Sequence, residues 1–338
     1  VLILDEPTAV LAPQEIEDLF KTLRSMTNEG KSIVFISHKL DEVMAIADRV
    51  TVMRKGKVTD ANVLTSETDK QELARLMVGR EVLFNLEKVE QAPGQDVLVV
   101  DNIEAINDKG LPALRGISLS VRAGEIVGLA GVAGNGQAEL AEVITGLRPP
   151  TAGCVKVHGK VVVGEGCESP RQNAVRAVIE TGVSHIPEDR THVGTAPNLS
   201  ITDNVIMKGY REVPIARGWS IDRTNARDHA ENLREDFNIL VPDVDTHARL
   251  LSGGNLQRLI LAREISSEPK LMIAMQPTRG LDVGAIEAVQ NLLLEQRANE
   301  AAILLVSEEL DELISLSDRI YVIYEGEIMG ETMLGDPE

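Results

Sequence analysis

Residues 1–13 read VLILDEPTAVLAP, and residues 271–283 repeat this stretch as LMIAMQPTRGLDV. The likeness continues without a gap, because residues 33–58 (IVFISHKLDEVMAIADRVTVMRKGKV) correspond to residues 303–328 (ILLVSEELDELISLSDRIYVIYEGEI). The offset is constant at 270 positions, as from Pro7 to Pro277 (277 − 7). Solenoid and propeller repeats are only about 20–50 residues long. The repeat therefore indicates duplication of a whole domain.

The two copies differ at the positions that carry reactive side chains. Asp5-Glu6 becomes Met275-Gln276 in the second copy, and His38 becomes Glu308. The apolar positions around these sites are kept in both copies. The repeat therefore predicts a duplicated domain in which one copy is active and the other is inactive.

Hydrophobic patterning within the repeat predicts strands that alternate with helices. Val1–Leu4 and Ser32–Ile36 are short apolar runs, typical of buried parallel strands. Residues 16–26 and the stretch after His38 have apolar side chains at helical spacing, and Lys55-Gly56 forms a hairpin turn. This alternation predicts an α/β fold in which a mainly parallel sheet is flanked by helices.

The domain organisation follows from what precedes each copy. Residues 97–270 precede the second copy, whereas nothing precedes the first, so we expect a chain that lacks the N-terminal part of its first domain. Residues 1–84 are then the C-terminal part of that domain, and the polar residues 85–96 are a linker. Residues 97–338 form the second domain, with short antiparallel strands in 151–164 and a helical subdomain at about 196–266.

Charge and composition exclude several classes of function. The net charge is −19 and the pI is about 4.8, whereas nucleic-acid binding requires a basic surface. The two cysteines, Cys154 and Cys167, lack the spacing of metal ligands, and we expect reduced thiols. No apolar run approaches the roughly 20 residues of a membrane-spanning helix.

A glycine-rich turn follows the strand predicted at residues 125–130. Its sequence resembles the phosphate-binding pattern G-x-x-x-x-G-K-[ST], in which backbone N–H groups surround an anion at a helix N-terminus. Here Gln137 replaces the lysine and Ala138 replaces the hydroxyl residue. The sequence therefore predicts a degenerate phosphate loop, and a plain tight turn between strand and helix is the alternative. The candidate binding residues in the loop, besides Gln137 and Ala138, are Gly131, Gly134, Asn135 and Gly136.

A second candidate phosphate contact lies at residues 251–257, which read LSGGNLQ. Ser252, Gly253 and Gly254 precede a predicted helix that starts near Asn255. A hydroxyl and exposed N–H groups at a helix N-terminus suit a γ-phosphate. An ordinary helix cap is the alternative, but the segment lies 24 positions before Gln276 (276 − 252) and follows a degenerate phosphate loop, which favours the phosphate contact.

Together these motifs resemble the ATP-binding subunits of ABC importers that fuse two ATPase domains in one chain. The subunits for simple sugars and nucleosides fit best, and the nucleoside branch is favoured. The resemblance covers essentially all 338 residues and is carried by five segments: DEPTAVL (5–11), GVAGNGQAEL (131–140), IPEDR (186–190), LLSGGNLQ (250–257) and QPTRGLDVGA (276–285).

The resemblance implies a P-loop NTPase fold of the ABC ATPase type, with ATP and Mg²⁺ as cofactors. It also implies integral-membrane permease subunits as partners and, indirectly, an extracytoplasmic substrate-binding lipoprotein. The expected location is the cytoplasmic face of the cell membrane. Two alternatives remain open: a soluble tandem ATPase that acts on ribosomes or nucleic acid, and a non-hydrolytic regulatory module.

The family's residue roles can be transferred to matching positions. Asp5 is expected in the Mg²⁺ shell, Glu6 is expected to polarise the attacking water, and His38 is expected to contact the γ-phosphate. Carboxylates and an imidazole suit these roles, because phosphoryl transfer depends mainly on positioning and charge stabilisation. In this family two ATPase domains pair with each other. The resemblance implies that each ATP lies between the phosphate loop and catalytic carboxylates of one domain (its Walker motifs) and the LSGG-containing signature segment of the other domain.

The second domain is expected to supply the signature to this intact site. Its contributing residues are Ser252, Gly253, Gly254 and Gln257, together with Asp282 of the following GLD segment. The other site would use residues 131–138 with Met275, Gln276 and Glu308, in which every visible catalytic side chain is altered. The resemblance therefore implies one hydrolytic and one degenerate site. We expect this chain alone to lack ATPase activity, because it contains no intact phosphate loop.

Several other acidic residues need an interpretation. Gln14-Glu15 and Asp41-Glu42 are interpreted as solvated helix faces. Glu188 stands where many family members carry glutamine, and we expect it to contribute to coupling with the membrane subunit.

No aromatic residue lies between Val97 and Ala123, where an adenine-stacking ring often occurs in this fold. This absence weakens expected nucleotide binding at the degenerate site.

Overall fold

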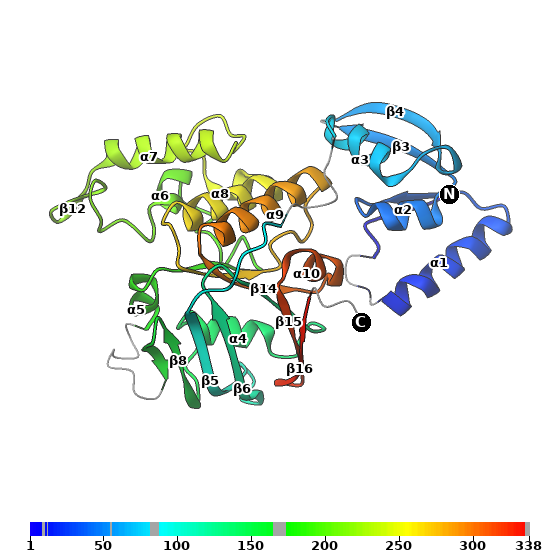
Figure 1. Cartoon of the computed structure of the whole chain (residues 1–338). Coiled ribbons are helices and arrows are strands. Elements are labelled where there is room, and N and C mark those ends of the chain that lie inside the picture. Colours follow the sequence, from blue (N-terminus) through cyan, green and yellow to red (C-terminus); the bar gives the residue numbers. More distant parts are fainter. Residues whose placement is uncertain (9–10, 12, 55, 82–87, 165–173, 335–338) are drawn as a thin grey trace. The chain divides into compact units, whose positions relative to one another are not determined.

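The computed structural model describes the whole chain except residues 9–10, 12, 55, 82–87, 165–173 and 335–338. The chain divides into two compact units (Figure 1). Unit 1 comprises residues 1–85 together with 280–289, and unit 2 comprises residues 86–279 together with 290–338. The two copies of the repeat thus fall into different units, except that residues 280–289 of the second copy belong to unit 1.

Unit 1 contains two separate strand pairs. In one pair the strands are parallel and are joined by a helix, and in the other they are antiparallel and meet at a hairpin. A small core of Leu40, Val52, Leu73 and Ala74 lies between the helices and the hairpin. The elements are β1 (Leu2–Asp5), α1 (Pro13–Asn28), β2 (Ile33–Ile36), α2 (Leu40–Ile46), β3 (Arg49–Arg54), β4 (Lys57–Leu64) and α3 (Lys70–Val78).

Unit 2 is built on a six-stranded sheet with the strand order β10-β13-β14-β7-β15-β16. All neighbouring strands are parallel except the β15–β16 hairpin, which confirms the predicted α/β fold. Most of the strands contribute fully buried side chains to the main core. The sheet strands are β7 (Ile126–Ala130), β10 (Val183–Ile186), β13 (Leu271–Met275), β14 (Ala302–Ser307), β15 (Arg319–Tyr324) and β16 (Glu327–Met333).

The rest of unit 2 lies on either side of this sheet (Figure 1). Helices α6, α7 and α8 lie on one side, and an antiparallel sheet of order β6-β5-β8-β9 lies on the other. The remaining elements are β5 (Asp96–Ile106), β6 (Pro112–Arg122), α4 (Gln137–Ile144), β8 (Ala152–Val157), β9 (Lys160–Gly164), α5 (Ala174–Glu180), α6 (Ile201–Val205), β11 (Ala216–Arg217), β12 (Ser220–Ile221), α7 (Arg223–Asp236), α8 (Gly253–Ile265) and α10 (Leu310–Leu316). Helix α9 (Val283–Ala298) is assigned to unit 1 up to Val289 and to unit 2 from Gln290.

Residues in the sequence fix where helices α7 and α8 of unit 2 begin. Asp222 caps α7, because its carboxylate accepts hydrogen bonds from the N–H groups of Thr224 and Asn225. Helix α7 lies within residues 196–266, the range expected to be a helical subdomain. Helix α8 begins at Gly253, two residues earlier than its predicted start near Asn255, so its N-terminal N–H groups belong to the glycine pair. None of the helices that the structure describes is long and apolar enough to cross a membrane.

The repeat gives the two units equivalent strands, but their sheets differ. Strands β1, β2, β3 and β4 correspond in sequence to β13, β14, β15 and β16, and in unit 2 the strand β7 pairs with both β14 and β15. Among its described residues, unit 1 has no strand that pairs with both β2 and β3. The two strand pairs of unit 1 are therefore not joined into one sheet.

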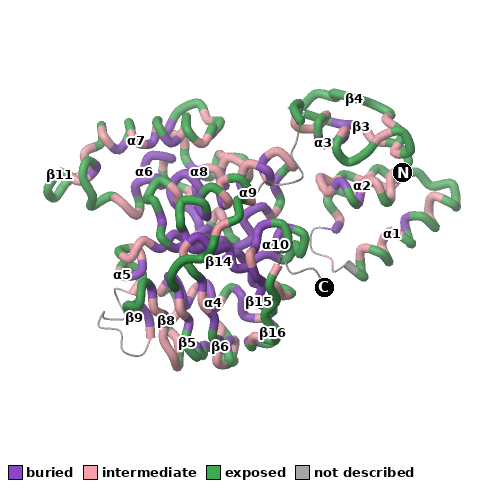
Figure 2. The backbone as a smooth tube through the Cα atoms, viewed as in Figure 1, coloured by how far each residue is buried: buried purple, intermediate pink, exposed green. Residues whose placement is uncertain are grey.

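Burial differs accordingly between the equivalent strands. Ile3 is 66% exposed, whereas its counterpart Ile273 is 0% exposed; Val34 is 47% exposed, whereas Leu304 is 0% exposed. Figure 2 shows buried backbone gathered around β14 in unit 2 and mostly exposed or intermediate backbone in unit 1. Parallel strands are normally covered on both faces. The apolar side chains of β1 and β2 thus lack the cover that their counterparts have.

Buried charges anchor β7 to its neighbours at its amino end. Arg319 donates to the carboxylate of Glu125 at 2.8 Å, to the Tyr321 hydroxyl at 2.7 Å and to the Ser120 carbonyl at 2.7 Å. Burial opposes ionisation of Arg319, but the hydrogen bonds to Glu125 and Glu331 hold its pKa above the usual value. Arg319 therefore fixes the register between β15 and the start of the strand that leads into the glycine-rich loop.

Candidate functional site

The carboxylate and imidazole predicted for catalysis lie together in unit 1. Asp5 ends β1, and Glu6 follows it with a φ of 44° while its N–H donates to the Ile36 carbonyl at 2.9 Å. Nδ1 of His38 lies 2.9 Å from Oε1 of Glu6, at hydrogen-bonding distance. Since β1 and β2 are parallel neighbours, their carboxyl ends bring Glu6 and His38 to the same edge. This edge is where ligands bind in open α/β sheets.

Asp5 has the chemistry that a magnesium ion requires. Its carboxylate is exposed at the carboxyl end of β1, beside the Glu6 backbone. Mg²⁺ prefers oxygen ligands and is held by one or two carboxylates together with substrate phosphates and water. Within the described residues no group of three or more potential metal-binding side chains occurs. The Asp5 carboxylate is therefore chemically suited to an ion that is also held by substrate phosphates.

The second copy keeps the backbone of this arrangement but not its chemistry. Gln276 has a φ of 46°, and its N–H donates to the Val306 carbonyl at 2.8 Å, as Glu6 does to Ile36. The Glu308 N–H donates to the Gln276 side-chain oxygen at 3.3 Å, which replaces the Glu6–His38 contact. Met275 is buried and offers a thioether, which is a poor ligand for Mg²⁺. The second copy therefore keeps the backbone positions, but it has an amide in place of the Glu6 carboxylate and a carboxylate, Glu308, in place of the His38 imidazole.

The glycine-rich turn forms a strand–loop–helix unit between β7 and α4. Gly134 and Gly136 have φ values of 87° and 105°, and a Cβ at Gly136 would lie 2.8 Å from the Ala113 carbonyl oxygen. Asn135 fastens the loop, because its amide donates to the Val132 carbonyl and its side-chain oxygen accepts from the Glu325 N–H. These contacts explain why glycine and asparagine occupy the turn.

The side chains at the start of α4 are not those of an intact phosphate site. Gln137 is buried, and its amide nitrogen folds back toward the loop and donates to the Val132 carbonyl at 3.1 Å. Ala138 is exposed and carries no hydroxyl. A Cβ at Gly131 would lie 2.7 Å from the Gln137 amide nitrogen, so this side chain packs directly on the loop. The loop keeps its shape but lacks the cation and the hydroxyl of an intact site.

The N-terminus of α8 is open to solvent. Ser252 is its N-cap residue and makes no capping bond to the helix backbone; its hydroxyl accepts from the Asn255 amide at 3.0 Å. A Cβ at Gly253 or Gly254 would meet nothing within 4 Å. Free space around exposed N–H groups is what an anion requires at a helix N-terminus.

Gln257 is held by a contact inside unit 2, and its expected part in the signature remains a prediction. Its side chain is 1% exposed, and its amide nitrogen donates to the Pro277 carbonyl at 2.7 Å. The prediction placed Gln257 with the signature residues because it follows them in the motif. One turn into α8, however, its side chain points into unit 2 and fastens the helix to the loop after β13.

Asp282 caps a helix in the structure. Its carboxylate accepts from the Ala285 N–H at 2.9 Å, at the start of α9. The segment that carries Asp282 belongs to the same compact unit as Glu6 and His38. The capping bond accounts for the aspartate locally, and its expected place at the hydrolytic site remains a prediction.

Two acidic residues lie in contacts that sequence reasoning missed. Glu42 was predicted to lie on a solvated helix face, and this is wrong: it is buried and accepts hydrogen bonds from Thr8 at 2.7 Å and Ser37 at 3.0 Å. Gln14, Glu15 and Asp41 are exposed, as predicted. Glu188 forms an ion pair with Arg279, which links the loop after β10 to the loop after β13. The repeat could have revealed Glu42, since Thr, Ser and Glu recur together 270 positions later.

A buried charge cluster holds the signature helix against the sheet. Glu264 of α8 is fully buried and pairs with Lys208 and Arg263, and it accepts from the His185 N–H at 2.9 Å. Burial by itself would raise the pKa of Glu264. The cations Lys208 and Arg263 outweigh this effect and leave the pKa below its ordinary value. Burial lowers the pKa of His185 to about 4, so its imidazole is neutral at physiological pH. The hydrogen bond from the His185 N–H to Glu264 joins the carboxyl-terminal end of α8 to β10, away from the exposed N-terminus of the helix.

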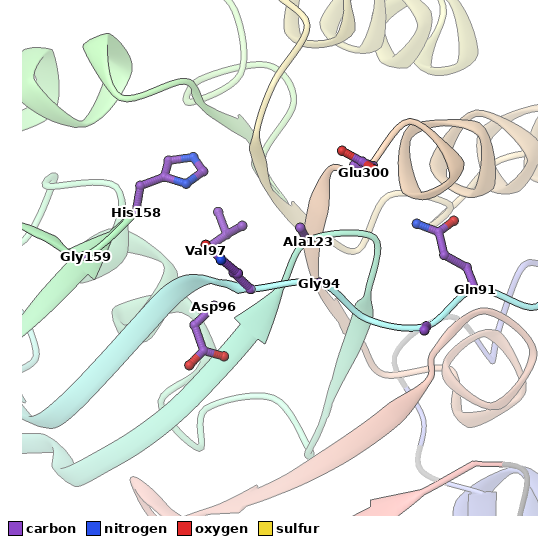
Figure 3. A pocket seen from close by; sticks show the side chains of 10 residues that line it. Gln91, Gly94, Asp96, Val97, Ala123, His158, Gly159 and Glu300 are labelled. Atoms are coloured by element: carbon purple, nitrogen blue, oxygen red, sulfur yellow. The ribbon is translucent and has the colours of Figure 1, made fainter.

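A pocket of about 670 Å³ in unit 2 lies away from these residues (Figure 3). It is bordered by Ala123, which precedes β7, and by Glu300, which precedes β14. The pocket is therefore at the amino ends of these strands, whereas the glycine-rich loop follows the carboxyl end of β7. None of the predicted site residues lines it. Its lining consists of Gln91, Ala92, Gly94, Gln95, Asp96, Val97, Ala123, His158, Gly159 and Glu300.

Comparison with known proteins gives consistent matches. Residues 114–279 match the family described as ABC transporter. The glucose import ATP-binding protein TsgD13 of Haloferax volcanii is 51% identical over 340 residues, covering 100% of this chain and 60% of that protein. The guanosine import ATP-binding protein NupO of Bacillus subtilis is 47% identical (97% and 63% covered), and the nucleoside import ATP-binding protein NupA of Lactococcus lactis is 44% identical (98% and 63% covered). The chain thus spans about three fifths of the length of these relatives.

Solved structures agree at the level of the fold. A dimeric post-hydrolysis state of the ATP-binding cassette MJ0796 with ADP and Pi matches with a TM-score of 0.58 at 20% identity, covering 71% of this chain and 100% of that one. The structure of cbiO1 from Clostridium perfringens matches with a TM-score of 0.54 at 19% identity, covering 71% and 89%. These likenesses confirm the predicted fold.

Proposed function

We propose, from the membership of this chain in the ABC transporter family of ATP-binding proteins, that it forms most of a tandem ATPase that powers import through a membrane permease. The observation that carries the proposal is the contact between Glu6 and His38, which the second copy lacks. In the proposed hydrolytic site, Asp5, Glu6 and His38 of unit 1 act together with the signature of unit 2.

The chemistry of this site follows from its side chains. Glu6 accepts a proton from, or polarises, the water that attacks the γ-phosphate. His38 lies beside Glu6, holds its orientation and reaches the same phosphate. Asp5 holds the Mg²⁺ shell, and the ion, when bound, supplies charge neutralisation at the phosphates. The exposed N-terminus of α8 at Ser252 supplies further N–H donors to the phosphate.

The second site is proposed to bind nucleotide at most, without turnover. Gln276 orients a water molecule but does not accept its proton, and Met275 does not serve Mg²⁺. The side chain of Gln137 already bonds within the glycine-rich loop and adds no positive charge there. The proposed protein therefore has two fused domains, and ATP is hydrolysed at only one of its two sites.

We propose that a further segment joins the two strand pairs of unit 1 into one sheet. We assign to this completing segment the pattern of β7, the glycine-rich loop and α4, because β7 occupies the equivalent position between β14 and β15. Exposure of Ile3 and Val34, whose counterparts are buried, supports the assignment. The relatives are longer than this chain and have room for such a segment. The completing segment would also bring the phosphate loop that the hydrolytic site requires.

The proposed cargo is a nucleoside or a simple sugar. Glucose, guanosine and nucleosides are named for the relatives compared above. The ATPase acts through integral-membrane permease subunits and, indirectly, through an extracytoplasmic substrate-binding lipoprotein, so it lies peripherally on the cytoplasmic face of the membrane. The charge of −19 argues against action on nucleic acid.

The proposal is tested by ATPase assays on this chain and on the completed protein, meaning this chain joined to its completing segment. The chain alone is expected to hydrolyse no more ATP than its Glu6→Gln variant. The completed protein, reconstituted with its permease in liposomes, is expected to hydrolyse ATP and to accelerate when binding protein loaded with nucleoside or sugar is added. A completed protein without ATPase activity, or a chain alone with turnover above its Glu6→Gln control, would contradict the proposal.

A further inference from the structure

We propose that the buried carboxylate of Glu42 is a positioning residue that holds Glu6 and His38 at their mutual distance, an inference that rests on the proposed function of this pair. Glu42 itself does not touch the pair. Oε2 of Glu42 accepts the hydroxyl protons of Thr8 at 2.7 Å and of Ser37 at 3.0 Å. One carboxylate oxygen therefore joins two segments that are 29 positions apart in sequence (37 − 8).

The hydroxyl groups of Thr8 and Ser37, which bond to Glu42, lie close in sequence to Glu6 and His38. Thr8 lies two residues after Glu6, and Ser37 lies one residue before His38. The hydroxyl of Ser37 also accepts from the Lys39 N–H at 3.0 Å, so it fixes the backbone on both sides of His38. A shift of either segment away from Glu42 would change the distance between the Glu6 carboxylate and the imidazole.

The backbone at Glu6 needs such support. Its φ of 44° lies in the left-handed region, which residues with a Cβ adopt only when their surroundings impose it. The Glu6 N–H bond to Ile36 holds one side of this turn, and the Thr8 bond to Glu42 holds the other. Loss of Glu42 would leave the turn with fewer constraints and the Glu6 side chain less well oriented.

The second copy separates this role from catalysis. Glu312 is buried and accepts from Thr278 at 2.7 Å, and the Ser307 hydroxyl accepts from the Glu309 N–H at 3.1 Å. Burial raises the pKa of Glu312, while hydrogen bonds from Ser307 and Thr278 oppose the rise. The arrangement is thus present beside Gln276, where the catalytic pair is absent. It acts on the two loops and not on the substrate.

The experiment compares equivalent variants in the two copies of the completed protein. Glu42→Ala is expected to lower kcat by roughly 10–100-fold with the KM for ATP within about twofold, since a misplaced catalytic group costs rate more than binding. Glu42→Gln, which keeps an acceptor oxygen, is expected to recover part of the rate. Glu312→Ala is the matched control and should leave kcat within about threefold. Asp41→Asn tests an exposed neighbouring carboxylate and should have no effect.

Amide exchange on the 338-residue chain supplies a readout that needs no turnover. Glu42→Ala is expected to speed exchange in residues 2–8 and 36–43 more than in α3, whereas a general loss of stability would speed all of unit 1 equally. Uniform exchange, or equal loss of kcat in Glu42→Ala and Glu312→Ala, would overturn the proposal. If Glu6→Gln keeps full activity, the proposed function fails, and the exchange pattern still decides whether Glu42 positions the loops.

Discussion

Replacing Glu6 by glutamine in the completed protein is expected to lower kcat for ATP hydrolysis by about 10²–10⁴-fold, the usual contribution of a positioned general base. Glutamine keeps the size of the side chain and an oxygen for His38, but it cannot accept a proton at neutral pH. Binding of ATP should change little, because the substitution adds no charge and removes no phosphate contact. Steady-state hydrolysis with a coupled phosphate assay measures the effect.

The repeat provides the control for this substitution. Gln276→Ala alters the equivalent position, which has the same left-handed backbone but no base. It is expected to leave kcat within about threefold, because the side chain it removes serves a site without turnover. Equal losses in the two variants would show two equivalent sites and would refute the asymmetry.

The largest expected effect on stability comes from Arg319. Arg319→Met leaves the carboxylate of Glu125 buried and without its cation, and removal of one partner from a buried pair costs about 3–5 kcal/mol. At about 2–4 °C per kcal/mol for a unit of this size, unfolding of unit 2 should shift down by roughly 6–20 °C. Differential scanning calorimetry measures the shift directly.

Arg49→Met is the matched control for Arg319→Met. Arg49 is the repeat's counterpart of Arg319 but is exposed in unit 1, so its replacement should change the stability by no more than about 0.5 kcal/mol. The double variant Arg319→Met, Glu125→Leu should recover part of the loss, because it removes the unpaired buried charge. If Arg319→Met unfolds at the temperature of the unaltered chain, the pair does not anchor β7.

The sequence predicts the elements of this fold well because strands and helices leave periodic signals. The apolar run before Asp5 and the glycine-rich loop after β7 both lie where their patterns place them. These predictions depend on local pattern, which the sequence encodes directly. The contact between Glu6 and His38 is not among them and comes from the parallel pairing of β1 and β2, whose carboxyl ends meet at one edge.

Burial of polar side chains could not be predicted in the same way. Asp41 and Glu42 are chemically alike and adjacent, yet only Glu42 is buried, because Thr8 approaches it from a distant segment. Gln257 likewise bonds to Pro277, which lies in another loop. Membership of residues 280–289 in unit 1 depends on tertiary contacts in the same way. Such contacts leave no helical or strand periodicity in the sequence; for Glu42 the available signal is the recurrence of Thr8, Ser37 and Glu42 at 270 positions' distance.

In the proposed hydrolytic site the base comes from unit 1 and the signature from unit 2. Ser252→Glu tests this arrangement most directly, because it places a negative charge at the N-terminus of α8, where the γ-phosphate is proposed to bind. Ser252 is exposed and makes no capping bond to the helix, so thermal unfolding should be nearly unchanged. The kcat of the completed protein is expected to fall as far as in Glu6→Gln. A Ser252→Glu variant that still hydrolyses ATP at the unaltered rate would contradict it.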